Sequence, residues 1–124
     1  MKYYTYRQNN SGGKWEIDES KGIGHYVIIF ADDAQDANYI AERIGIDFHT
    51  GCPCCGDRWT EQYDDSDGKY IPMIYGENLE EALNDKWIAK NGESIFLHFT
   101  KKEFVKITEE NAKNFLQNES NRSN

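Results

Sequence analysis

A chain of 124 residues is long enough for one domain with a single hydrophobic core. Its formal net charge of -8 argues against binding to nucleic-acid phosphates, which needs clustered Lys and Arg. The charge leaves open a partner with a basic surface, although the simpler interpretation is that acidity keeps a small protein soluble. No apolar run is long enough to span a bilayer and no signal peptide follows Met1, so we expect a cytoplasmic protein.

Aromatic residues make up 14% of the chain while hydrophobic residues make up only 38%, so we expect a core rich in large rings. Residues 2–8 alternate around Tyr4 and Tyr6 and predict a first strand. Residues 9–13 are Asn, Ser and Gly, which predict a turn or loop. Residues 15–17 alternate again, and this favours pairing back on the first strand.

The clearest local architecture is a strand, a helix and a second extended segment. Residues 25–31 are β-branched and aromatic and predict a central strand. Asp32 or Asp33 then caps a helix, and Gly45 is placed to end it in the left-handed conformation before residues 46–48 extend again. The apolar residues of this helix recur at spacings of three and four and form one stripe: Ala34, Ala37, Ile40, Ala41 and Ile44.

The second half of the chain predicts shorter elements. Four of them are a short strand at residues 59–63, an acidic turn at 64–68, an edge strand or loop at 70–75 and a short helix at 77–85. Asn91-Gly92 is a hairpin dipeptide that is expected to join residues 87–89 to 94–99. A second hairpin leads to residues 104–107, and Thr108 opens a last helix.

These elements predict one α+β domain over residues 1–116. Its sheet is expected to be antiparallel or mixed, with about five to six strands and two to three helices. Residues 117–124 contain no apolar side chain and are expected to form a disordered polar tail.

A cysteine-rich segment follows the predicted helix. Cys52 and Cys55 have the spacing of a zinc knuckle, and His49 is placed to be a third ligand. The fourth would have to be Cys54, Asp57 or a residue of a second subunit. The alternative is a loop of reduced cysteines held by turns and packing, because half of the usual ligand set is missing. Nothing in the segment favours a redox helix or an activated nucleophile, so we assign no catalytic residue.

A second group of residues has the chemistry of a nucleotide site. Arg7 and Arg58 can bind phosphates, and Trp59 can stack on a base. Backbone amides and Asn side chains of the loop after Arg7 would supply the other contacts: Asn9, Asn10, Gly12 and Gly13. The alternative is that Trp59 anchors its segment in the core while Arg58 pairs with an acidic residue.

Two of the histidines lie in or beside predicted strands. His25 begins one apolar strand and His98 lies inside another, so both are expected to be hydrogen-bonded structural residues. The acidic turn at residues 64–68 lacks the spacing and terminal Glu of a calcium loop and is interpreted as a solvated turn.

Several segments carry a resemblance to a known family. They are residues 3–13 (YYTYRQNNSGG), 24–29 (GHYVII), 37–45 and 52–59 (CPCCGDRW). In their order they resemble a family of small phage and prophage proteins of unknown function. The resemblance implies a protein of a bacterial virus that acts in the host cytoplasm, a setting in which small proteins often inhibit host defence.

The leading hypothesis is therefore a non-enzymatic protein that counteracts antiviral defence by sequestering a cyclic nucleotide or an ADP-ribose-type signal. Such pockets often lie between subunits, so a homo-oligomer is expected. One alternative is an acidic inhibitor that covers a basic surface on a host enzyme, motivated by the net charge of -8. A third hypothesis is an enzyme that uses the cysteine segment.

Overall fold

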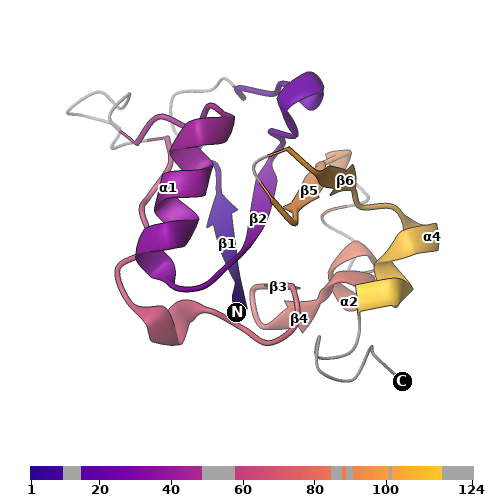
Figure 1. Ribbon diagram of the computed structural model, residues 1–124. Coiled ribbons are helices and arrows are strands. Elements are labelled where there is room, and N and C mark those ends of the chain that lie inside the picture. The colour runs from indigo at the N-terminus through magenta and orange to yellow at the C-terminus, as the bar shows by residue number, and fades with distance from the viewer. Residues whose placement is uncertain (10–14, 49–57, 85–87, 89–90, 101, 116–124) are drawn as a thin grey trace.

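A four-stranded mixed sheet forms the centre of the molecule (Figure 1). The computed structural model describes residues 1–9, 15–48, 58–84, 88, 91–100 and 102–115. The strands, in spatial order, are β1 (Lys2–Arg7), β2 (Tyr26–Ala31), β5 (Ile95–His98) and β6 (Phe104–Lys106). β2 is antiparallel to β1 and parallel to β5, and β6 returns antiparallel to β5.

The prediction of a central strand at residues 25–31 is confirmed. β2 has a neighbour on each edge, and Val27, Ile28 and Ile29 are fully buried because both of its faces are covered. A strand buried on both faces has no polar side to expose, which explains why the run is continuous rather than alternating.

Helix α1 (Ala34–Ile44) covers one face of the sheet and matches the predicted helix. The Asp33 side chain accepts a hydrogen bond from the Asp36 amide at 2.7 Å, which caps the first turn. Gly45 ends the helix at φ 117°, and the Ile46 amide bonds back to the Ala41 carbonyl at 3.0 Å. All five residues of the predicted stripe are buried against the sheet.

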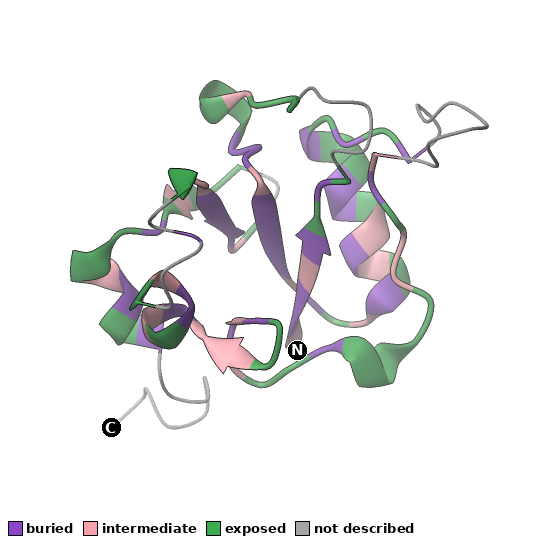
Figure 2. Ribbon diagram, turned by 180° about the vertical axis from the view of Figure 1, so that it is seen from behind, coloured by how far each residue is buried: buried purple, intermediate pink, exposed green. Residues whose placement is uncertain are grey.

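The opposite face is covered by smaller elements. They are α2 (Leu79–Asn84), α4 (Glu109–Ala112), the 3-10 turn η3 (Lys113–Phe115) and the hairpin of β3 (Met73–Ile74) and β4 (Glu77–Asn78). Each face of the sheet therefore has its own apolar cluster, and the buried residues in Figure 2 concentrate on the strands and the inner sides of the helices. These layers confirm a single α+β domain with a mixed sheet.

Two further 3-10 turns lie at opposite ends of α1. Turn η1 (Glu19–Lys21) lies beyond the helix C-terminus, and turn η2 (Asp65–Asp67) lies beside its N-terminus, where the Asp65 carboxylate accepts the Ala34 amide at 2.9 Å (Figure 1). None of the helices among the described residues is long and apolar enough to cross a bilayer.

Three predicted strands are absent from the described residues: 15–17, 46–48 and 59–63 have no strand pairing. The neighbour of β1 is β2 instead, with Arg7 opposite Tyr26. Alternation over three residues is too short a signal to specify a partner, and here each segment is held by side-chain bonds or by a buried ring.

The predicted hairpin at Asn91-Gly92 is also wrong. Ile88 and Asn91 are helical, Gly92 has φ 67°, and the Glu93 amide bonds to the Ile88 carbonyl at 3.0 Å. This is the geometry of a helix end, which uses the same left-handed glycine as a tight hairpin. β5 does not form a hairpin at this glycine but pairs in parallel with β2. The second predicted hairpin, between β5 and β6, is confirmed.

Candidate functional site

Arg7 and Arg58 do not meet. Arg7 lies on the face of β1 that carries Tyr3 and Thr5; its guanidinium stacks on Tyr75 at 4.5 Å and donates a hydrogen bond to the Tyr75 hydroxyl. Gln8, the next residue, faces the opposite side of the sheet, because side chains alternate along a strand. Arg58 bonds there to Gln8, so the two arginines are on opposite faces.

Arg58 is paired with an acidic residue. Its Nε lies 3.3 Å from the Glu16 carboxylate, and its terminal amine donates to the Gln8 side chain at 3.2 Å. The Arg58 carbonyl accepts the Asn9 amide at 2.7 Å. Arg58 therefore forms the ion pair with an acidic residue that was the alternative to phosphate binding.

Trp59 is 2% exposed and belongs to the apolar cluster beneath α1. Its ring offers no free face to a base in this structure. The burial agrees with the alternative interpretation, in which Trp59 anchors the segment that follows the cysteines.

The other predicted site residues lie outside the described residues. They are Asn10, Gly12, Gly13, His49, Cys52, Cys54, Cys55 and Asp57, together with the tail at 117–124. Among the residues that the structure does describe, no group of three or more His, Cys, Asp or Glu side chains could hold a metal ion. Zinc binding by the cysteine segment stays a prediction.

Gln8 is a structural residue that the sequence reasoning missed. It is 7% exposed, and its amide nitrogen donates to the carbonyls of Glu16 and Gly24 at 3.1 and 3.0 Å. Its amide oxygen accepts from the Glu16 amide at 2.5 Å and from Arg58 at 3.2 Å. One buried side chain therefore ties the end of β1 to three other segments. A polar residue at an inward position of a strand was the available signal.

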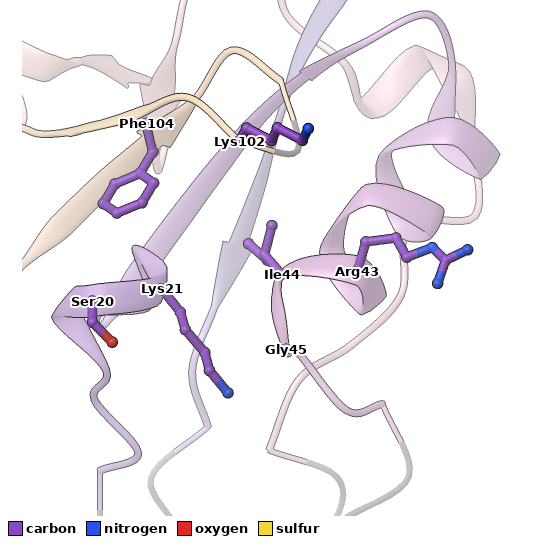
Figure 3. Close-up of a pocket in the computed structure, with 7 residues that line it drawn as sticks. All are labelled: Ser20, Lys21, Arg43, Ile44, Gly45, Lys102 and Phe104. Atoms are coloured by element: carbon purple, nitrogen blue, oxygen red, sulfur yellow. The ribbon is translucent and has the colours of Figure 1, made fainter.

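A basic pocket of about 420 Å³ lies beside the C-terminal end of α1, between turn η1 and the turn that joins β5 to β6 (Figure 3). We call it the basic pocket. Its lining residues are Ser20, Lys21, Arg43, Ile44, Gly45, Lys102 and Phe104. Three of these seven residues are cationic and none is acidic, although the whole chain carries a net charge of -8.

Local structure places the three cations at the rim. Lys21 belongs to η1, a loop closed by two backbone bonds of 2.9 Å between Asp18 and Ile23. Lys102 lies on a turn that the Thr100 hydroxyl shapes by accepting the Lys102 amide at 3.1 Å. Figure 3 shows Lys21 and Lys102 on two sides of the pocket, whereas the Arg43 guanidinium points outward.

The opposite end of α1 is acidic. Carboxylates surround the first turn of the helix: Asp32, Asp33, Asp36, Asp64, Asp65 and Asp67. Negative charge is stabilised near a helix N-terminus and positive charge near a C-terminus, so the charge order follows the polarity of α1. A small anion is therefore expected to be attracted to the basic pocket more strongly than to the acidic start of α1.

The two walls of the pocket touch at a buried histidine. His98 is fully buried, and its Nε2 lies 2.7 Å from the Gly22 carbonyl of η1. Its ring packs on Phe104 of β6 with centroids 5.1 Å apart. Gly22 has φ 71°, and a Cβ there would lie 2.7 Å from the His98 ring and 2.8 Å from Phe104. The side of η1 thus packs directly on the sheet through a glycine.

His25, just before β2, and His98, on β5, are both hydrogen-bonded within the fold, as predicted. His25 Nδ1 accepts a hydrogen bond from the Ser94 amide at 2.9 Å. Burial lowers the pKa of His25, and the negative charge of Glu93 only partly offsets this effect. Burial also lowers the pKa of His98, which the bond to Gly22 only partly offsets. Among the described residues, His98 Nδ1 has no hydrogen-bond partner.

We expect stability to fall as the pH drops below the unfolded-state histidine pKa of about 6.5, because the unfolded chain then binds a proton that the folded His98 resists. The loss continues down to the lowered folded pKa. Urea unfolding of the wild type and His98→Gln between pH 8 and pH 5 would measure this. The difference between the two free energies should shrink toward acidic pH, and a constant difference would contradict the assignment.

Comparison with known proteins identifies the family. The family described as "Domain of unknown function (DUF7296)" matches residues 1–117, so the chain belongs to this family. No curated protein matched the chain, and no solved structure matched it.

Proposed function

We propose that this member of the DUF7296 family is a non-enzymatic binding protein whose basic pocket takes a small phosphate-bearing molecule of the nucleotide type. One observation carries the proposal: of the seven described lining residues, Lys21, Arg43 and Lys102 are cationic and none is acidic, in a chain with a net charge of -8. Lys21 also forms an exposed ion pair of 4.0 Å with Asp18, which is not among these lining residues. Lysine and arginine are the side chains that bind phosphate oxygens.

The size and the charge pattern support a small ligand. A volume of about 420 Å³ lies within the range of small-molecule sites. The acidic remainder of the surface does not suit a long polyanion, which would extend beyond the pocket and meet repulsive carboxylates. A compact anion satisfies both conditions.

The resemblance to small phage proteins supplies the biological setting of the proposal. In the cytoplasm of an infected host, a binding protein present in excess over a nucleotide signal would lower its free concentration and so counteract antiviral defence. No chemical step is required of such a protein. A homo-oligomer remains part of this proposal.

Calorimetric titration tests the pocket with pyrophosphate, ADP, ADP-ribose and a cyclic dinucleotide. At least one is expected to bind, with an affinity that falls as salt is raised, because exposed charges are screened. Lys21→Glu and Lys102→Glu should each weaken binding about tenfold. Lys113→Glu makes the same charge change on η3, on the other face of the sheet, and should bind as the wild type does.

An unchanged affinity in both pocket variants would place the ligand elsewhere and refute this site. If no phosphate compound binds the wild type, a second candidate function is favoured, in which the protein inhibits a host enzyme that has a basic surface. The carboxylates around the start of α1, beside the exposed rings of Tyr39 and Tyr63, support that candidate.

A further inference from the structure

We propose that Phe104 determines the specificity of the basic pocket by stacking on a planar base, so that the pocket selects nucleotides over phosphates that lack a base. This inference rests on the proposed function of the same pocket. It also supplies the aromatic contact that the sequence had assigned to Trp59, whose ring is buried.

Phe104 is the one aromatic side chain among the described residues that line the pocket. It is 37% exposed, whereas its neighbours Phe96 and His98 are 2% and 0% exposed. In Figure 3 its ring stands at one side of the pocket, between Lys102 and η1. An apolar ring among cationic side chains gives the pocket two kinds of contact, one for phosphate and one for a flat apolar surface.

The ring of Phe104 is held in place before any ligand arrives. Phe96 contacts it with centroids 5.9 Å apart at 70°, and His98 packs beside it at 5.1 Å and 34°. Gly22 closes the space near the ring edge, since a Cβ there would lie 2.8 Å from a Phe104 carbon. A ring that is already fixed loses little conformational freedom on binding, so stacking contributes nearly its full value.

The positions of the cations fit a nucleotide with its base on this ring. Lys102 lies two residues before Phe104, which begins β6, and Lys21 lies next to Gly22, where an added Cβ would lie 2.8 Å from the ring. A base on Phe104 therefore brings its attached phosphates toward both lysines. Stacking on an aromatic side chain tolerates any base, so the inference concerns bases as a class.

The test compares ADP with pyrophosphate by calorimetry in the wild type and in three variants. Wild-type protein is expected to bind ADP about tenfold more tightly than pyrophosphate. Phe104→Leu should remove most of that difference by weakening ADP alone, and Phe104→Trp should restore it. Tyr70→Leu, which changes an exposed ring elsewhere, should match the wild type. Circular dichroism confirms that each variant is folded.

The outcomes separate the two proposals. Equal affinities for ADP and pyrophosphate, or an equal loss of both in Phe104→Leu, would overturn the role of Phe104 and leave the phosphate site in place. If Phe104→Leu does not fold, Phe104→Tyr and Phe104→Trp must still retain the preference for ADP. Absence of binding by either compound to the wild type would overturn the proposed function, and this inference with it.

Discussion

Replacing Gly22 with alanine is expected to lower the free energy of unfolding by about 3 kcal/mol. A non-glycine residue at φ 71° costs about 1–2 kcal/mol, and overpacking a close contact costs about 1–3 kcal/mol more. The new methyl group would collide with His98 and Phe104, so η1 would have to move away from β6. Urea unfolding measures the first effect, and titration with ADP should show weaker binding as the second.

Gly76→Ala is the matched control for this substitution. Gly76 has φ 79°, and an added Cβ would meet nothing within 4 Å, so only the conformational cost of about 1–2 kcal/mol remains. Ligand affinity should not change in this variant. Equal destabilisation of Gly22→Ala and Gly76→Ala would show that the contact with His98 is not tight.

Gln8→Leu is expected to cost about 3 kcal/mol, because it removes four hydrogen bonds of one buried side chain. The Gly24 carbonyl loses this partner within the protein interior, and Arg58 loses its hydrogen bond to Gln8. The substitution preserves the approximate size of the side chain, so lost polar contacts rather than a cavity should dominate. Chemical denaturation measures the difference.

Gln35→Leu serves as the control for Gln8→Leu, since Gln35 is exposed on α1 and its replacement should stay within about 0.5 kcal/mol. Amide hydrogen exchange adds a second readout. Loss of Gln8 should speed exchange at Glu16, whose amide bonds to the Gln8 side chain. Unchanged stability and exchange would mean that the segment at residues 15–16 is held by other contacts.

Patterns within short stretches of sequence correctly predicted the elements that form between neighbouring residues. The β2–α1 unit has a continuous apolar strand, an Asp cap, a buried stripe and a terminating glycine, and each was read correctly from adjacent residues. The turn at Gly92 was misread because a left-handed glycine ends helices as well as hairpins. Parallel pairing of β2 with β5 joins residues about 70 apart, which no short pattern encodes.

The candidate site was harder to predict for the same reason. Lys21, Arg43 and Lys102 come from three separate elements, and none lies in a recognisable motif. Arg7 and Arg58 were assigned to one site because both side chains can bind phosphate, but the sequence does not show on which face of the sheet each side chain lies. Alternation along β1 separates Arg7 from Gln8, but only the structure shows that Arg58 joins the side of Gln8.

The opposite charges at the two ends of α1 have a consequence for how a ligand first encounters the protein. The electric field of an approaching small anion exerts a torque on the protein, which tends to orient its basic end toward the anion. The carboxylates at the start of α1 repel the anion, whereas Lys21 and Lys102 attract it toward the pocket. The rate of productive collision should therefore exceed that of an evenly acidic protein with the same net charge, and it should decline as added salt shortens the reach of the field.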